Sequence, residues 1–355
     1  MNKSFEKGNV AIAKAAVAAG CRYYFGYPIT PQSDIPEYLS GALPKVGGQF
    51  VQAESEIGAI NMVLGAGATG KRAMTSSSSP GISLKQEGIS YMAGSEIPGL
   101  IVNIQRSGPG LGGIDPSQGD YFQSTRGGGH GDYRVIVLAP ASVQEMYDLT
   151  VLGFDLADQY RTPVLILADA MLGMMKEPLE EWVPERKEFD KQAWCLTGAA
   201  GRDRRRIKSL YLSDGELAKH NWALKEKYEE ISRCETKAQV EMPAGCELAV
   251  AAFGSAARIA KSAIDRVNDE GRRVGLVRPI TLWPFPTAAV REVAENGVPL
   301  LTVELNTGQM VEDVRLAVEG RVPVGFAGYP PGYMPSPDDV YAEILKHLPP
   351  QEVHS

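Results

Sequence analysis

The sequence predicts an α/β protein with two domains, and three observations point to this class. The chain has 355 residues, which is more than one small hydrophobic core usually organises. Its 38 Gly and 24 Pro residues imply many tight turns. Short apolar runs rich in Val, Ile and Leu alternate with stretches of helical length, a pattern typical of buried parallel strands between helices.

The first domain is expected over residues 1–175. An Ala-rich helical stretch runs to Ala19, Gly20 ends it, and an aromatic strand follows at residues 23–25. The same alternation continues along the domain. The further predicted strands are 72–75, 100–104, 135–138 and 164–167, and the further predicted helices are 57–64, 82–92 and 143–157.

Residues 176–246 differ in character and are interpreted as a charged connector. Charged residues crowd this segment, and it contains no apolar run of the kind that forms strands. One helix is predicted within it, from Gly215 to about Ser232. The packed face of this helix is expected to consist of Leu217, Trp222, Leu224 and Ile231.

A second, smaller α/β domain is expected over residues 247–350. After its first strand, Gly254 and Ser255 are interpreted as a turn and a helix N-cap, and Gly271 as the end of that helix. A second helix is predicted at 309–318, closed by Gly320. The predicted strands are 248–253, 274–277, 300–303 and 322–326.

Composition argues against several classes of function. The net charge of −7 leaves no basic stripe for a nucleic-acid backbone, and no apolar run reaches the roughly 18 residues of a membrane span. The four Cys and four His residues show no ligand spacing, so we expect no disulfide framework, iron–sulfur cluster or metal site built by this chain alone. The N-terminus lacks the apolar core of a signal peptide, which predicts a cytoplasmic protein.

Residues 65–70 match the G-x-G-x-x-G dinucleotide fingerprint, but their context does not. The fingerprint follows a strand and opens a helix, whereas here it closes a predicted helix and precedes a strand. No acidic residue ends a following strand about 20 residues further on. We therefore interpret the segment as a tightly packed helix end and expect no NAD site.

Two carboxylates, Glu54 and Glu56, stand at the start of the helix predicted at 57–64. Both can complement the positive N-terminal end of the helix dipole, and this role is sufficient for Glu54. Glu56 adjoins the apolar face of the helix and can point into a covered site. A carboxylate in such a place needs a partner.

Three further candidates follow predicted strands, where open α/β sheets bind ligands. The run Tyr27-Pro28-Ile29-Thr30-Pro31 follows the first strand, and Thr30 either faces a ligand or is a plain N-cap. The Ser-rich segment 75–81 is either a ligand-facing turn or an N-cap with solvated neighbours. Arg106 either grips a carboxylate with two parallel hydrogen bonds or lies on the surface. The Gly-rich loop 108–131 is interpreted as a mobile active-site or subunit-contact loop.

Six ordered motifs are similar to those of one protein family. They are YPITP at 27–31, QAESEIGAINM at 52–62, SSPG at 78–81, IQR at 104–106, RPITLWPFP at 278–286 and VELNTGQMVEDVR at 303–315. Together they resemble the alpha subunit of the 2-oxoacid:ferredoxin oxidoreductases of the branched-chain or 2-oxoglutarate type. The resemblance spans both α/β domains. It implies a thiamine diphosphate-binding fold, in which a pyrimidine-side domain precedes a transketolase C-terminal-like domain.

The resemblance also assigns roles to the candidate residues. Glu56 would donate to the pyrimidine ring nitrogen of thiamine diphosphate, and the backbone around Tyr27, Pro28 and Ile29 would contact the exocyclic amine. Thr30 and Arg106 would bind the carboxylate of the substrate. The implied reaction is oxidative decarboxylation of a 2-oxoacid with coenzyme A to acyl-CoA and CO₂, with electrons leaving through iron–sulfur clusters to ferredoxin.

Two gaps in the sequence imply partner subunits. The chain has no GDG segment followed by the Asn of a diphosphate–magnesium site, and it has no cluster cysteines. The resemblance places the diphosphate–magnesium half-site on a beta subunit and adds gamma and ferredoxin-like delta subunits, with the clusters on partners. The segment 328–332 departs from the family pattern, in which an Arg and paired glycines are expected, so we assign it no contact.

Other functions stay open at this point. The chain could be a non-catalytic scaffold subunit of the same complex or an anion-binding α/β protein. It could also belong to a thiamine-dependent decarboxylase without electron transfer. The joint presence of Glu56 and Arg106 favours a catalytic subunit, because a scaffold would not need both.

Overall fold

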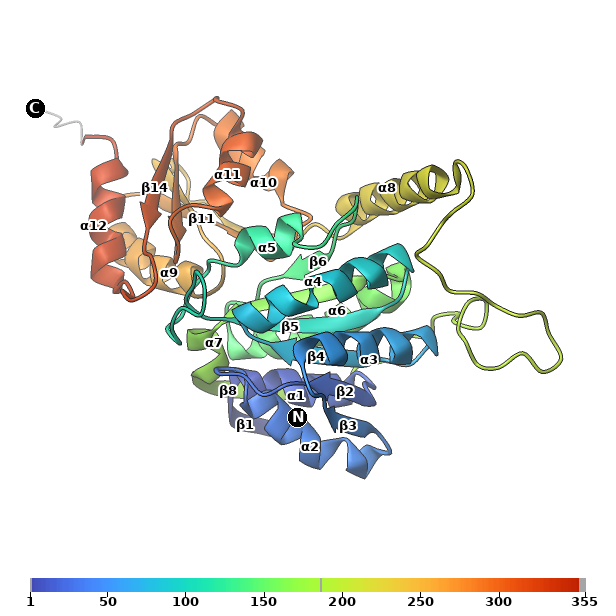
Figure 1. Cartoon of the computed structure of the whole chain (residues 1–355). Helices are drawn as coiled ribbons and strands as arrows, with labels where there is room; N and C mark the ends of the chain where they lie inside the picture. Colours follow the sequence, from blue (N-terminus) through green and yellow to red (C-terminus); the bar gives the residue numbers. More distant parts are fainter. Residues whose placement is uncertain (1, 186, 351–355) are drawn as a thin grey trace, which may run out of the picture.

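The computed structural model describes residues 2–185 and 187–350, and its main elements surround two sheets (Figure 1). The first sheet has seven strands in the order β12-β6-β7-β5-β4-β2-β3. All neighbouring strands in it are parallel except β12 and β6. The seven strands are β2 (Tyr23–Gly26), β3 (Gln49–Gln52), β4 (Ala73–Ser77), β5 (Gly99–Gln105), β6 (Ile136–Leu138), β7 (Pro163–Asp169) and β12 (Thr281–Trp283).

Two central strands of this sheet, β5 and β7, are mostly apolar in sequence. β5 and β7 pair over their full length, from Gly99 opposite Pro163 to Gln105 opposite Asp169, and all of their residues are buried. A parallel strand covered on both faces has no solvated side, so its residues do not alternate between apolar and polar. The apolar runs predicted at 100–104 and 164–167 therefore lie at the centre of the domain.

Helices cover both faces of the first sheet, as in doubly wound α/β folds. In Figure 1, α3 and α4 lie side by side on one face, while α1 packs against α2 and α6 on the other. The segment 65–70 closes α3, as predicted, and a Cβ on Gly67 would lie 2.5 Å from the Pro98 carbonyl oxygen. These helices are α1 (Gly8–Ala18), α2 (Asp34–Ala42), α3 (Glu56–Ala68), α4 (Ser79–Gly94) and α6 (Val143–Tyr160), with a 3₁₀ turn, η1, at Pro44–Val46 and a short helix, α7, at Ala170–Met174.

The second sheet has five strands in the order β14-β13-β10-β11-β9, of which only β9 is antiparallel to its neighbour. Its strands are β9 (Ala238–Glu241), β10 (Leu248–Ala251), β11 (Val274–Pro279), β13 (Leu300–Glu304) and β14 (Val324–Gly328). Its helices are α9 (Gly254–Asp269), α10 (Thr287–Glu295), α11 (Met310–Val318) and α12 (Pro337–His347). Helix α9 begins at Gly254 after Phe253, so Ser255 lies inside the helix and is not its N-cap.

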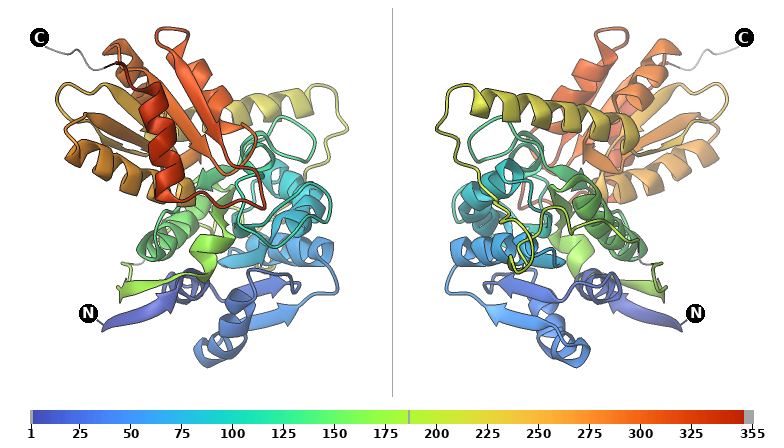
Figure 2. Two further views of the ribbon diagram at one scale, coloured as in Figure 1. Left: turned by 90° about the vertical axis from the view of Figure 1, so that its left-hand side faces the viewer. Right: turned by 90° about the vertical axis from the view of Figure 1, so that its right-hand side faces the viewer.

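The segment 176–246 corrects two expectations. It contains two strands that were not predicted, β8 (Lys176–Glu181), which pairs with β1 (Asn2–Lys7), and β9. Helix α8 (Glu216–Cys234) matches the predicted helix and buries Leu224 and Ile231, but Leu217 and Trp222 are exposed. Between β8 and α8 the described residues form no helix or strand (Figure 2). Both missed strands lie at sheet edges, where β8 is rich in charged residues and β9 has only four residues, so neither has the apolar run that reveals a buried strand.

The segment 278–286 links the two sheets. Arg278 lies at the end of β11 in the second sheet, and β12 follows directly and joins the first sheet beside β6. The 5% exposed Arg278 makes two hydrogen bonds to Glu145 of α6, at 2.6 and 2.9 Å. The motif RPITLWPFP at 278–286 therefore corresponds to a structural connection between the two sheets.

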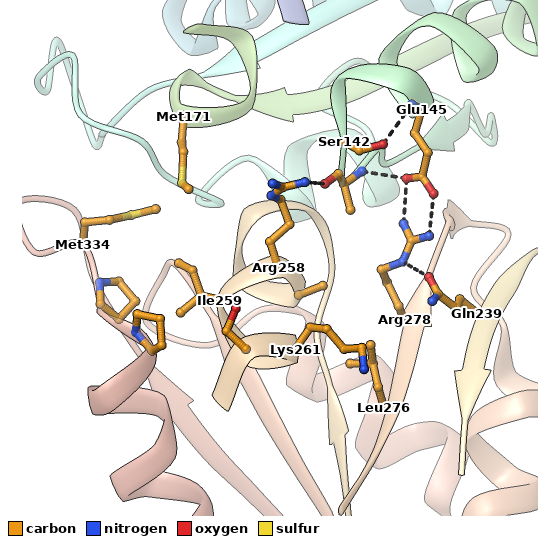
Figure 3. A pocket seen from close by; sticks show the side chains of 15 residues that line it. Ser142, Glu145, Met171, Gln239, Arg258, Ile259, Lys261, Leu276, Arg278 and Met334 are labelled. Carbon is orange, nitrogen blue, oxygen red and sulfur yellow. Dashed lines mark hydrogen bonds and ion pairs between the residues drawn. The ribbon is translucent and has the colours of Figure 1, made fainter. Parts of the chain in front are cut away.

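A cavity of about 610 Å³ lies in the seam between the sheets (Figure 3). Arg258, Lys261 and Arg278 line it, but each of them has a partner in the structure. Arg278 pairs with Glu145, Arg258 pairs with Glu177 at 2.6 Å, and Lys261 pairs with carboxylates beside it. Because these cations are already neutralised, they offer an anionic ligand no unpaired positive charge. None of the described helices, over 2–185 and 187–350, is both long and apolar enough to cross a membrane.

Candidate active site

The candidate residues lie at the carboxyl ends of four adjacent strands of the first sheet. The strands β5, β4, β2 and β3 are neighbours in that order, and all of them run in the same direction. Arg106 follows β5, the Ser-rich segment ends β4, Tyr27 follows β2, and Glu56 comes soon after β3. The structure thus gathers at one edge of the sheet the residues that the sequence singled out.

The segment after β2 is the most exposed part of this edge. A Cβ on Gly26 would lie 2.3 Å from the Tyr24 hydroxyl, so a larger residue here would have to displace the buried Tyr24 side chain. Tyr27, Pro28 and Thr30 are exposed, and Ile29 is half-buried. Helix α2 begins at Asp34 after Ser33. The interpretation of Thr30 as an N-cap is therefore wrong, and its hydroxyl does not cap that helix.

Glu56 is the first residue of α3 and is 6% exposed. Ser55 is the N-cap of this helix, and its hydroxyl accepts a hydrogen bond of 3.1 Å from the Gly58 amide. A Cβ on Gly81 would lie 2.7 Å from Glu56 Oε1, so the carboxylate points across to the start of α4. Glu54 lies before the helix and is exposed. The structure thus buries Glu56, as expected for a covered site, and leaves Glu54 in solvent.

The Ser-rich segment is buried, so its interpretation as an N-cap with solvated neighbours is wrong. Thr75, Ser76, Ser77 and Ser78 have no exposed surface. Ser78 is the N-cap residue of α4, but its side chain makes no capping hydrogen bond. The hydroxyl oxygens of Thr75, Ser77 and Ser78 have no hydrogen-bond partner among the described residues. Buried hydroxyls without partners are uncommon, which makes this turn a candidate for contact with a further molecule.

Ser79 holds the main chain of Arg106 in place. Its hydroxyl accepts a hydrogen bond of 3.0 Å from the Arg106 amide and donates one of 2.6 Å to Asp120, which also accepts 2.8 Å from Asn103. Burial raises the pKa of Asp120, and the hydrogen bonds from Ser79 and Asn103 oppose this effect. The start of α4 therefore contacts both Glu56, through Gly81, and Arg106, through Ser79.

The guanidinium of Arg106 has one edge engaged, and its other edge holds a donor that is buried and unmet. Nη1 donates to the Thr30 carbonyl at 3.1 Å. Nε has no partner among the described residues, and Nη2 makes only a long contact of 3.4 Å to the Leu111 carbonyl. The Nε–Nη2 edge is one that binds a carboxylate through two parallel hydrogen bonds.

The loop 108–131, interpreted from sequence as a mobile active-site or subunit-contact loop, is packed against the second domain in its second half. Its second half contains α5 (Tyr121–Arg126), and Gln118 and Tyr121 are fully buried against the second domain. Gln118 bonds to the Phe253 carbonyl at 2.8 Å, and Tyr121 donates to Asp313 at 2.6 Å. The Tyr121 contact involves the VELNTGQMVEDVR motif, and the glycine-rich composition of the loop indicated neither contact. Only the first half of the loop, with Leu111 82% exposed, presents apolar side chains to solvent.

Sequence reasoning missed Lys85, which the structure buries completely in α4. Burial lowers the pKa of Lys85 to about 8, and the negative charge of Glu56 partly opposes this effect. The signal was present in the sequence, because Lys85 is the one cationic residue in a helix otherwise made mostly of small and apolar residues. Ser79 and Asp120 lie in two segments that the sequence singled out, 75–81 and 108–131, but their hydrogen bond to each other was not predicted.

A cavity lies beside the candidate residues. A cavity of about 620 Å³ opens next to Ser79, Gly108 and Asp120 and extends to Asn306 of the second domain. A buried carboxylate, unpaired hydroxyls and a half-free guanidinium are groups suited to a ring nitrogen, an amine and a carboxylate. Over the described residues, no three His, Cys, Asp or Glu side chains gather as a metal ion requires.

The fold is that of thiamine diphosphate-binding α/β proteins with a transketolase-like second domain. Residues 14–199 match the family model described as pyruvate flavodoxin/ferredoxin oxidoreductase, thiamine diP-bdg. Residues 246–340 match the model described as pyruvate:ferredoxin oxidoreductase core domain II. The chain therefore belongs to the 2-oxoacid:ferredoxin oxidoreductase family, as a subunit of the alpha type.

Individual relatives agree with this assignment. The chain is 51% identical over 313 residues to the ketoisovalerate oxidoreductase subunit VorB of Methanothermobacter marburgensis, covering 88% of each chain. It is 36% identical to the 2-oxoglutarate synthase subunit KorA of Methanothermobacter thermautotrophicus, covering 96% of this chain and 98% of that one. The solved 2-oxoglutarate:ferredoxin oxidoreductase from Magnetococcus marinus superposes with a TM-score of 0.88 at 26% identity, over 97% of this chain and 65% of that chain.

Proposed function

We propose that this chain is the subunit that supplies the pyrimidine-side half of the active site in a 2-oxoacid oxidoreductase. The complex would convert a 2-oxoacid and coenzyme A to acyl-CoA and CO₂ and release two electrons to ferredoxin or a similar acceptor. The observation that carries this proposal is the buried carboxylate of Glu56 facing the start of α4, at the same sheet edge as the Arg106 guanidinium. A scaffold subunit has no need of both groups.

Glu56 would hold thiamine diphosphate through the pyrimidine ring nitrogen, and the backbone of residues 27–29 would hold its exocyclic amine. When bound, the cofactor supplies the carbon nucleophile for the 2-oxo carbon and retains the electron pair released with CO₂. Glu56 would exchange a proton with the ring nitrogen. Its burial favours this role because a carboxyl group shielded from water exchanges its proton with the ligand it contacts.

Arg106 and Thr30 would bind the carboxylate of the 2-oxoacid. The Nε–Nη2 edge of Arg106 would take the two carboxylate oxygens, which would give the buried Nε the partner it lacks and replace the long contact of Nη2 to the Leu111 carbonyl. Ser79 and Asp120 fix the main chain that carries this guanidinium. Because the 51% identical relative is named a ketoisovalerate oxidoreductase subunit and the 36% identical one a 2-oxoglutarate synthase subunit, we rank branched-chain 2-oxoacids first as substrates.

Partner subunits would complete the site. We propose a beta subunit with the diphosphate–magnesium half-site, and gamma and ferredoxin-like delta subunits, with iron–sulfur clusters on these partners. The relatives are named as subunits, which supports a multi-subunit complex. Exposed apolar side chains surround the site on this chain and suit a contact surface for the beta subunit. They are Tyr27, Ile57, Leu84, Leu111 and Ile114.

The test is anaerobic purification of the chain with its partners, followed by dye-linked assays with 2-oxoisovalerate, 2-oxoglutarate and pyruvate. We expect dye reduction and CO₂ release that depend on the 2-oxoacid and on coenzyme A. Release of CO₂ and a free aldehyde without dye reduction would indicate a decarboxylase without electron transfer. A cofactor-loaded complex that leaves all three acids unchanged would contradict the proposal.

A further inference from the structure

A further cavity, of about 370 Å³, lies at the amino-terminal edge of the first sheet. Its walls come from the end of α4, the turn before β7, the segment 193–211 and the first turns of α8. Glu96 precedes β5 and Arg161 precedes β7, whereas Arg106 follows β5. Because both strands are seven residues long, roughly 20 Å of strand separates this cavity from the candidate active site.

The lining of this cavity is rich in basic side chains. They are Arg161, Arg205, Arg206, Lys208 and His220. Among the described lining residues, Glu96 is the one acidic side chain, and Lys227 pairs with it at 2.6 Å. Lys208 pairs with Glu216 at 3.2 Å. The two carboxylates of this region are therefore already matched by the two lysines.

The three arginines have no carboxylate partner within the part of the chain that the structure describes. Arg161 Nε donates to the Glu96 carbonyl at 3.3 Å, and Arg205 Nη1 donates to the Cys195 carbonyl at 2.8 Å. Both acceptors are uncharged main-chain groups, and the exposed Arg206 makes no hydrogen bond to any described residue. A guanidinium is always charged in proteins, so three positive charges at this cavity are left unbalanced.

Aromatic rings hold two of the basic side chains in place. The guanidinium of Arg161 lies 4.7 Å from the centre of the Trp194 ring, a cation–π contact. His220 stacks on Tyr211 with 4.9 Å between ring centres, and its Nε2 donates to the Gly94 carbonyl at 2.8 Å. The cavity thus has walls in which the positive groups are already oriented.

The pKa of Glu96 shows the sign of the electrostatic field at this place. Burial raises the pKa of Glu96, but the charges of Lys227, Arg161 and His220 lower it by more, so that it lies below its usual value. The groups around the cavity therefore stabilise negative charge, although the chain as a whole has a net charge of −7.

We propose that this cavity binds the phosphate groups of a small metabolite, at a site separate from the candidate active site. Guanidinium groups bind phosphate through parallel charged hydrogen bonds, and a phosphate has enough terminal oxygens to contact more than one arginine. The volume lies in the range of small-molecule sites, and a concave site built from several segments suits a small ligand better than a protein surface. The bound anion would fasten the segment 193–211 to the ends of α4 and α6. This inference does not depend on the proposed function of Glu56 and Arg106.

The test is calorimetric titration of the full chain with inorganic diphosphate and with ADP, without magnesium. We expect both to bind, and the affinity to fall about 10- to 100-fold in Arg161→Gln and in the double variant Arg205→Gln/Arg206→Gln. The double variant changes a segment outside the helices and strands, so it keeps the test valid if Arg161→Gln does not fold. Tighter binding of ADP than of diphosphate would identify a nucleotide as the ligand, and equal binding would show that the phosphate groups alone are recognised.

Two matched controls separate this site from other sources of binding. Arg204→Gln changes the same basic run but a residue that does not line the cavity, and Arg106→Gln changes the candidate active site. Both should bind diphosphate as the wild type does. Equal weakening in all variants, or no binding at millimolar ligand, would overturn the proposal. If partner subunits alone shield Arg205 and Arg206 from phenylglyoxal, the cavity is a subunit contact and the proposal is wrong.

Discussion

Arg106 Nη1 donates a hydrogen bond of 3.1 Å to the carbonyl oxygen of Thr30, a residue 76 positions away in the chain. The two residues follow β5 and β2, which are separated in the sheet by β4. Their hydrogen bond spans the carboxyl end of β4. It uses Nη1, so the Nε–Nη2 side of the guanidinium faces away from Thr30. This geometry explains how one arginine can be held by its own chain and still bind a carboxylate.

We predict that Arg106→Lys weakens substrate capture and leaves cofactor binding intact. A lysine keeps the charge but cannot form two parallel hydrogen bonds, and a hydrogen bond to a charged group contributes about 1.5–3 kcal/mol. The KM for the 2-oxoacid should therefore rise roughly 10- to 100-fold in the dye-linked assay. Arg126→Lys is the control, because Arg126 pairs with Asp313 outside the site. Unchanged substrate dependence in Arg106→Lys would show that Arg106 does not bind the substrate.

The parts of the fold that could be predicted from sequence are those in which a short stretch of residues is enough to indicate the element. The apolar runs at 100–104 and 164–167 form the central strands, and Glu56 stands at a helix start as the sequence indicated. The carboxyl ends of parallel strands share one edge of a sheet, so the gathering of Tyr27, Glu56 and Arg106 also followed from the pattern.

The parts that were missed depend on contacts between distant segments. The strands β1 and β8 pair at an edge through charged sequences, and β12 leaves the second half of the chain to join the first sheet. The loop containing Gln118 and Tyr121 is rich in glycine, yet it is held by Asp313 and by main-chain groups nearly 200 residues away. No local pattern encodes such partners.

The chain alone should bind thiamine diphosphate weakly or not at all. Only groups for the pyrimidine side have been identified on it, and over the described residues no acidic or His/Cys cluster is suited to magnesium. Calorimetric titration of the purified chain with thiamine diphosphate and Mg²⁺ should therefore show little heat. Submicromolar binding by the chain without a partner would contradict a site shared between subunits.

Lys85→Met should stabilise the chain at neutral pH. The pKa of Lys85 is lowered from 10.5 to about 8 in the fold, so between these values the unfolded chain binds a proton that the folded chain does not. Wild-type stability must then rise with pH across this window, and the penalty for the buried charge is fully present below about pH 8. The difference corresponds to roughly 3 kcal/mol. Urea unfolding of both proteins should show an advantage for Lys85→Met at pH 7 that shrinks towards pH 10.5.

Glu145→Gln should weaken the seam between the two sheets. It would leave Arg278, which is 5% exposed, without its charge partner, and breaking a buried pair costs about 3–5 kcal/mol. Since the Glu145 side chain is 29% exposed, we expect a loss near the lower end of this range in urea unfolding. Glu229→Gln is the control, because the exposed pair of Lys225 and Glu229 should contribute less than about 1 kcal/mol. Equal losses of unfolding free energy in both variants would show that the Glu145–Arg278 pair stabilises the fold no more than an exposed pair does.

Glu56→Gln should abolish most of the activity while the complex still assembles. Glutamine keeps the size and hydrogen-bonding ability of glutamate but has no acidic proton to exchange with the pyrimidine nitrogen. Positioned acid–base groups contribute roughly 10²- to 10⁴-fold to rate, so we expect a loss of that order in dye-linked 2-oxoacid oxidation and in exchange of the cofactor C2 proton. Glu54→Gln is the matched control, since Glu54 lies two residues away and is exposed. If Glu56 only complemented the helix dipole, each variant would lose at most about 1 kcal/mol of stability and keep near-normal turnover, and the scaffold interpretation would replace the catalytic one.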